Sequence, residues 1–212
     1  DPEEGRSGNR FNDGKCDPAG RFLAGTMSLN GERAQGVLYS LSTKGSVSLL
    51  VDKASISNGL AWSPDHRTMY YIDTPTLEVV SFDYDVTQGT IKNKQVVARL
   101  DESEGYPDGM TIDAEGMLWI ARWGGKRVSR IHPAQGEVIA EVSLPVNCVT
   151  SCAFGGEHLD ELYITTAQDG DNTDQPLAGG LFMVKTGVKG VPTSYFNQGQ
   201  AADWLDLLPK KA

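Results

Sequence analysis

Residues 57–73 read SNGLAWSPDHRTMYYID and hold the pattern on which the fold depends. An Asn-Gly pair stands near the start, a Ser-Pro-Asp-His turn interrupts the stretch, and an apolar run closes it. Similar stretches start at Asn12 and Asp108, and a weaker one starts at Ser151, so the pattern recurs after 46, 50 and 43 residues. A period of this length, filled with short segments, predicts repeated structural units.

Each unit has the features of a small antiparallel sheet. Alternating or β-branched runs dominate throughout, and a helical period of 3.6 residues is absent. Turn residues join two strand-like runs as a hairpin in each unit, at 17–20, 63–66, 113–116 and 154–157. Third runs follow at 37–40, 79–82, 128–131 and 181–184, and outer runs at 47–50, 95–98 and 138–141. The sequence therefore predicts an all-β propeller in which four blades are readable.

Polar side chains occupy the same register in three of the units. Asn12, Asn58 and Asp108 lie in the leading strand of a unit, which is normally the innermost strand of a propeller blade. Equivalent positions lie at equal distances from the axis, so we expect the three side chains to converge at one end of the central channel. Asn-Gly and Asp-Gly also form turns, which is the alternative for any single copy. Three oxygen-bearing side chains in one register favour a shared pocket.

Length and composition limit the class of protein. The chain has 212 residues, and we interpret residues 1–212 as a single propeller domain with a tail at 198–212. The net charge of −9 argues against nucleic acid and anionic membranes as partners. No apolar run approaches the roughly 18 residues of a membrane span. Three cysteines without paired metal-ligand spacing favour a reducing compartment, and we predict a cytoplasmic location.

Several stretches are specific when they are taken together: RFNDGK at 10–15, DPAGR at 17–21, SNGLAWS at 57–63, PDGM at 107–110 and TSCAFGG at 150–156. They resemble the regucalcin family, which is also known as senescence marker protein and includes gluconolactonases. The resemblance runs from about Asn9 to Tyr195. It implies a six-bladed propeller, of which about four blades are present here. It also implies one divalent metal ion at the mouth of the channel and hydrolysis of small, sugar-type lactones. We predict that the protein is a monomer.

The resemblance assigns roles to four residues. Asn58 and Asp108 match two of the three protein ligands of the metal, and Arg10 and Asn12 match positions that contact the substrate. Arg10 precedes Asn12 by two residues, so in an extended strand both face the same side. In relatives the third metal ligand is a glutamate in the first blade, and no strand-like copy of that motif occurs here. We therefore interpret the chain as incomplete at its N-terminus, lacking roughly the first two blades.

These residue types suit lactone hydrolysis. A divalent ion held by oxygen ligands polarises the carbonyl group, and Asp108 beside it serves as general base for the attacking water. Asn58 offers a neutral amide oxygen as ligand. Arg10 donates hydrogen bonds to substrate oxygens, and Asn12 supplies a donor and an acceptor for hydroxyl groups. Oxygen ligands favour Ca²⁺, Mg²⁺ or Mn²⁺, and leave Zn²⁺ open.

A second class of function stays open. The propeller could bind Ca²⁺ as a regulatory or scaffold protein, with little or no catalysis. Insect relatives that act in luciferin recycling are a third, narrower possibility. Arg10 and Asn12 favour the enzyme, because a calcium buffer has no use for a cationic donor shaped for a substrate. A serine hydrolase is disfavoured, since the sequence has no Gly-x-Ser-x-Gly motif.

Overall fold

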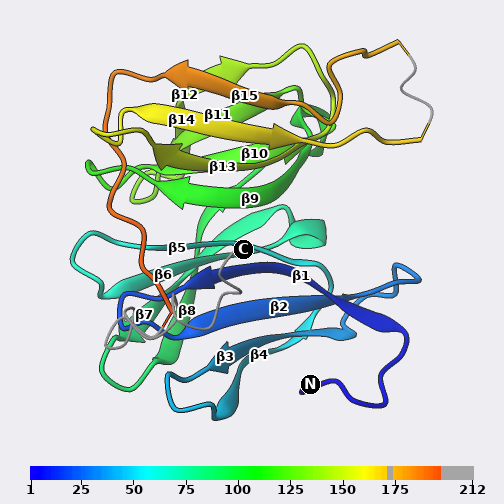
Figure 1. Cartoon of the computed structure of the whole chain (residues 1–212), viewed down its shortest axis with the longest axis vertical. Helices are drawn as coiled ribbons and strands as arrows, with labels where there is room; N and C mark the ends of the chain where they lie inside the picture. Colours follow the sequence, from blue (N-terminus) through cyan, green and yellow to red (C-terminus); the bar gives the residue numbers. More distant parts are fainter. Residues whose placement is uncertain (171–173, 197–212) are drawn as a thin grey trace, which may run out of the picture.

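Four antiparallel sheets follow one another in chain order in the computed structural model, which describes residues 1–170 and 174–196 (Figure 1). The first sheet contains β1 (Asn9–Cys16), β2 (Phe22–Ser28), β3 (Gly36–Leu41) and β4 (Val47–Ala54). The second contains β5 (Ser57–Trp62), β6 (Thr68–Asp73), β7 (Glu78–Asp85) and β8 (Thr90–Arg99). The third contains β9 (Tyr106–Ile112), β10 (Leu118–Trp123), β11 (Arg127–His132) and β12 (Glu137–Ser143). The fourth contains β13 (Val149–Gly155), β14 (Glu161–Thr166) and β15 (Leu181–Lys185).

The predicted all-β propeller with four blades is confirmed. Every run predicted as a strand lies within an observed strand, and three of the four predicted hairpin turns stand where the sequence placed them. The fourth turn differs, because β13 continues to Gly155 and the chain turns at 156–159. Two single turns of 3-10 helix, η1 (Thr74–Thr76) and η2 (Glu102–Glu104), complete the elements. The predicted tail at 198–212 lies outside the described residues.

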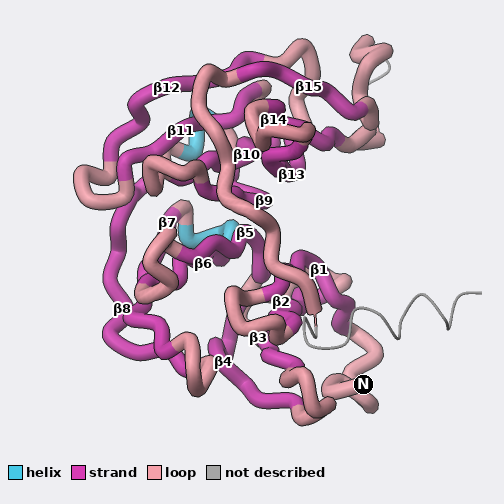
Figure 2. Tube along the Cα trace, turned by 60° about the vertical axis from the view of Figure 1, so that its left-hand side comes forward, coloured by secondary structure: helices cyan, strands magenta, loops and turns pink. Residues whose placement is uncertain are grey.

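Apolar cores between neighbouring sheets hold the blades together. Each core draws on the facing surfaces of two sheets, and Figure 2 shows the sheets side by side in chain order. The first and second sheets share Leu23, Leu38, Leu60 and Met69; the second and third share Ile72, Val79, Met110 and Ile120; the third and fourth share Trp119, Val128, Cys152 and Leu162. Burial of apolar surface at about 25 cal/mol per Å² makes these contacts the main source of stability.

The leading strands β1, β5, β9 and β13 lie next to one another around the axis of the propeller. The strand that leads each blade is therefore the innermost, as the sequence predicted. After β15 the chain crosses back past the third sheet, where Asp113 pairs with Gly190, and continues toward the first sheet (Figures 1 and 2). Among the described residues, no helix is long and apolar enough to cross a bilayer.

Candidate functional site

A break in strand pairing recurs in every leading strand and positions the candidate residues. The register shifts between Phe11 and Gly14 in β1, between Ser57 and Leu60 in β5, and opposite Ile120 and Arg122 in β9. A β-bulge leaves residues out of the ladder and turns their side chains away from the sheet. Asn12, Asn58 and Asp108 each lie in such a bulge. The structure therefore places the three residues at equivalent positions of neighbouring blades.

Asn58 and Asp108 lie against each other. Burial raises the pKa of the Asp108 carboxyl group to about 7, and the charge of Asp13 adds to the rise. Hydrogen bonds from the Gly109 backbone N–H and from the Asn58 amide oppose it. A carboxylate that is desolvated, next to a second carboxylate and beside a neutral amide is a favourable place for a hard cation.

A hydroxyl group joins the two candidate ligands from a third element. The Asn58 Nδ2 donates to Thr74 Oγ1 at 2.9 Å, and Thr74 Oγ1 donates to the backbone oxygen of Pro107 at 2.7 Å. Asn58 is 6% exposed and Thr74 is half-buried. In the described part of the chain, no hydrogen bond is made to Asn58 Oδ1, so this oxygen stays available as a ligand.

Arg10 and Asn12 are linked to each other and to the second blade. Asn12 Nδ2 donates to the backbone oxygen of Ser57 at 2.9 Å, one residue before Asn58. Arg10 Nη1 donates to Asn12 Oδ1 at 3.0 Å and to the Phe11 oxygen at 2.9 Å. Arg10 is exposed, which leaves its other N–H groups accessible to a bound molecule. The prediction that Arg10 and Asn12 face the same side agrees with this contact.

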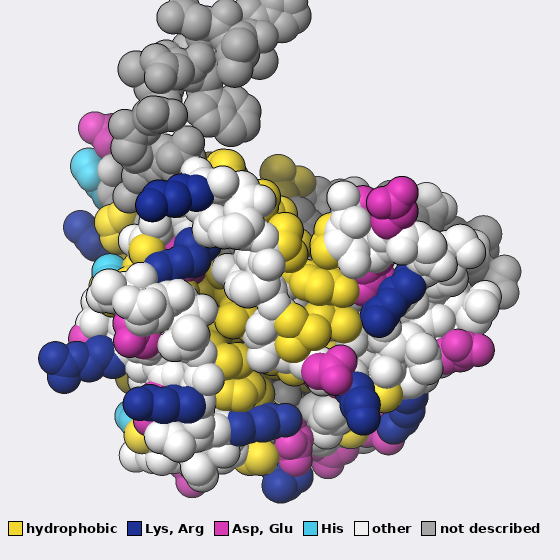
Figure 3. All heavy atoms as spheres, turned by 90° about the horizontal axis from the view of Figure 1, so that it is seen from below, with side chains coloured by type: hydrophobic (Ala, Val, Ile, Leu, Met, Phe, Trp, Pro, Cys, Tyr) yellow, Lys and Arg dark blue, Asp and Glu magenta, His cyan; other side chains and the backbone are white. Residues whose placement is uncertain are grey.

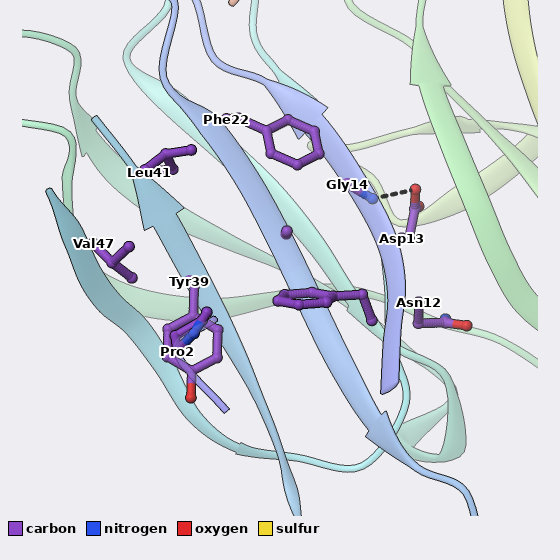
Figure 4. Close-up of a pocket in the computed structure, with 10 residues that line it drawn as sticks. Pro2, Asn12, Asp13, Gly14, Phe22, Tyr39, Leu41 and Val47 are labelled. Carbon is purple, nitrogen blue, oxygen red and sulfur yellow. Dashed lines mark hydrogen bonds between the residues drawn. The ribbon is translucent and has the colours of Figure 1, made fainter. Parts of the chain in front are cut away.

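Two residues of the site, Asp13 and Lys15, were missed by sequence reasoning. Figure 4 shows Asn12 and Asp13 at one edge of β1, away from the apolar residues over the face of the sheet. Burial raises the pKa of the Asp13 carboxyl group. The charge of Lys15 and a hydrogen bond from the Gly14 backbone N–H oppose this rise. Lys15 Nζ donates to the Met110 oxygen at 2.6 Å and so reaches from the first blade to the third. Asp13 and Lys15 are two positions apart in a strand, and this spacing was the signal that both face the channel.

Lys15 has a perturbed pKa because it lies inside the propeller. Burial lowers the pKa of the Lys15 ammonium group, while the charge of Asp13 opposes the shift. Burial also raises the pKa of Cys152 to about 12, so this thiol is protonated and unreactive at neutral pH. Lys15 therefore lies beside the Asp13 carboxyl group, near the two candidate metal ligands.

The donor set suits a divalent cation but provides few protein ligands. Within residues 1–170 and 174–196, no three His, Cys, Asp or Glu side chains gather in a way that could hold a metal. Glu3 does not supply a third ligand, because its carboxylate accepts hydrogen bonds from Asn9 at 2.8 Å, Thr26 at 3.1 Å and Tyr39 at 3.2 Å. The residues that fit the cation are therefore Asn58 and Asp108, with Asp13 nearby.

The chain has well-characterised similarity to one protein family. The sequence pattern of the family described as SMP-30/gluconolactonase/LRE-like region matches residues 1–168. The chain belongs to this family. Human regucalcin is 48% identical to it over 201 residues, which are 90% of this chain and 67% of regucalcin. YvrE of Bacillus subtilis, a protein named after sugar lactone lactonases, is 50% identical over 185 residues, covering 85% of this chain and 63% of YvrE.

Solved structures of the SMP-30/gluconolactonase/LRE-like family share the fold. A luciferin-regenerating enzyme superposes with a TM-score of 0.84 at 40% identity, over 92% of this chain and 67% of the enzyme. Regucalcin from Agrobacterium tumefaciens, described as a calcium-binding protein, superposes with a TM-score of 0.86 at 33% identity over the same shares. The chain thus spans about two thirds of the length of the relatives it matches.

Proposed function

We propose that this chain carries the reactive face of a divalent-metal-dependent lactonase that opens small, sugar-type lactones. The observation that carries the proposal is the contact between Asn58 and Asp108 at equivalent bulges of neighbouring blades. Membership of a family that includes gluconolactonases supports the reaction class. A small-molecule substrate suits the side chains around this pair, which are polar and come from adjacent blades.

Each residue of the candidate site has its own role in the proposed hydrolysis. A divalent cation held by Asn58 Oδ1 and the Asp108 carboxylate would polarise the lactone carbonyl. Asp108 accepts a proton from the water that attacks the carbonyl carbon. The ring C–O bond then breaks, and the leaving oxygen takes that proton from Asp108 to give a hydroxy acid. Arg10 and Asn12 orient the substrate through hydrogen bonds.

Substitution of each ligand tests the proposal. Asp108→Ala or Asn58→Ala should abolish lactone turnover and divalent-ion binding while the circular dichroism spectrum stays that of the parent. Asp52→Ala is the control, because Asp52 is an exposed carboxylate of β4. Turnover would be followed by acid release from a panel of lactones, with Ca²⁺, Mg²⁺, Mn²⁺ or Zn²⁺ added after chelation. Normal turnover in either ligand variant would refute the assigned roles.

A Ca²⁺-binding regulatory or scaffold role is the second candidate. It is supported by the structural neighbour that is described as a calcium-binding protein. This role predicts reversible Ca²⁺ binding without turnover of any lactone in the panel. The assay above therefore separates the two functions. A cytoplasmic location, a monomeric state and a single domain over residues 1–212 stay predictions, which fractionation, gel filtration and limited proteolysis would test.

A further inference from the structure

The Thr74 hydroxyl determines which way the Asn58 amide points. A hydroxyl group has one proton, and the Pro107 carbonyl oxygen, 2.7 Å away, can only accept it. The Thr74 oxygen must therefore accept its other hydrogen bond, the one at 2.9 Å to Asn58. Only the Nδ2 end of the amide can donate. The hydrogen-bond network thus fixes Nδ2 toward Thr74 and leaves Oδ1 on the other branch of the amide.

Thr74 is itself held in place from several sides. Its backbone N–H donates to the Ile56 oxygen at 3.1 Å. The Asp73 carboxylate, immediately before it, accepts N–H groups of Ser55 and Ile56 at 2.9–3.1 Å. Pro75 follows and restricts the backbone of η1. A β-branched side chain on a fixed backbone has few rotamers, so the hydroxyl is preorganised.

We propose that Thr74 is a positioning residue that presents Asn58 Oδ1 to the divalent cation; the inference rests on the function proposed above. Without the hydroxyl, Asn58 Nδ2 loses the acceptor at 2.9 Å that distinguishes the two ends of the amide. The amide can then turn over and present a nitrogen without a free lone pair to the cation. Thr74 also anchors the Pro107 carbonyl, so one hydroxyl positions both candidate ligands.

Two substitutions at Thr74 and one at Thr76 test the inference. Thr74→Val removes the hydroxyl at similar shape, and Thr74→Ser keeps it. Thr76→Val is the matched control, because Thr76 lies in the same turn but its hydroxyl donates to the Asp73 oxygen at 2.7 Å, apart from Asn58. Ca²⁺ and Mn²⁺ affinities would be measured by calorimetry after chelation, and metal-free unfolding midpoints would show that the fold is kept.

We expect Thr74→Val to bind both ions about 10 to 100 times more weakly, the range found when partners of metal ligands are removed. Thr74→Ser and Thr76→Val should bind like the parent. In the metal-free protein, the side-chain amide signals of Asn58 in an ¹H–¹⁵N NMR spectrum should shift in Thr74→Val and stay in Thr76→Val.

Equal affinity of the parent and Thr74→Val would overturn the inference alone. The same would follow if Thr74→Ser lost as much affinity as Thr74→Val. A parent chain that binds no divalent ion would instead overturn the proposed function, and the inference with it. The two failures are therefore distinguishable in one titration series.

Discussion

The buried Asp108 carboxyl group lowers the stability of the metal-free protein near neutral pH. Its carboxyl pKa rises from 3.8 to about 7, first through burial and then through the charge of Asp13. The folded chain therefore binds more protons than the unfolded chain between these two pH values. Under that condition the free energy of unfolding falls as pH rises from about 4 to about 7, and stays low above it. A bound cation would offset the penalty, since it takes the place of the proton.

Asp108→Asn should therefore stabilise the metal-free protein. An amide mimics the protonated acid, so the free energy of unfolding at pH 8 should rise by about 1 kcal/mol or more, while at pH 4 the variant and the parent should be alike. Urea unfolding in the presence of a chelator measures both. With Ca²⁺ or Mn²⁺ added, the order should reverse, because only the parent gains from binding. A variant that is less stable at pH 8 in the chelator would contradict this account.

The sequence could indicate some of these residues and not others. Asn58 and Asp108 were found because the repeat places them in one register. Thr74 and Lys15 were not, because each acts on a backbone carbonyl, that of Pro107 or Met110, in another blade. Every residue has a backbone carbonyl, so no residue type in the sequence marks such a partner. The partner of Lys15 also lies 95 positions away. Only the packing of blades brings such groups together.

The leading strands meet closely, and this explains their glycines better than turns do. Gly59 and Gly109 lie within β5 and β9, and neither has a positive φ. A Cβ on Gly109 would stand 2.3 Å from Ser151 Oγ and 2.8 Å from the Thr150 oxygen of the next blade. A Cβ on Gly59 would stand 2.8 Å from the Asp108 oxygen. The Asn-Gly and Asp-Gly pairs therefore combine a polar side chain for the channel with a gap for the neighbouring strand.

Gly109→Ala should separate the third and fourth blades. The Thr150 carbonyl is backbone and cannot rotate away, so we expect a loss of about 2 kcal/mol in the free energy of unfolding, typical of an overpacked core. Gly8→Ala is the matched control: no atom lies within 4 Å of the position that its Cβ would take, and its φ is not positive. Urea unfolding of both variants in a chelator gives the comparison. Equal stability of the two would exclude close strand approach as the reason for Gly109.

The four sheets leave one apolar face without a neighbour in the described part of the chain. Phe11, Phe22, Val47 and Leu49 of the first sheet are 38–54% exposed and lie on the side away from the second sheet. Phe11, Phe22 and Val47 border a hollow of about 290 Å³ (Figure 4). The view from below Figure 1 shows apolar side chains gathered across the middle of the molecule (Figure 3). The predicted six-bladed ring, of which four blades are in this chain, would account for such a face. The alternating runs predicted strands, but alternation alone cannot tell which face of a sheet is covered.

Val47→Ser combined with Leu49→Ser should test whether this face behaves as an open interface. Contiguous apolar surface of this kind binds hydrophobic dyes and promotes association. We expect less binding of anilinonaphthalene sulfonate and less concentration-dependent association in the double variant. The free energy of unfolding should change by under about 1 kcal/mol, because both side chains are about half exposed. Leu29→Ser is the control, since Leu29 is 58% exposed but follows the end of β2 and is not part of a strand. Unchanged dye binding in the double variant, or an equal fall in the control, would show that the apolar face of the first sheet is not the surface that the dye recognises.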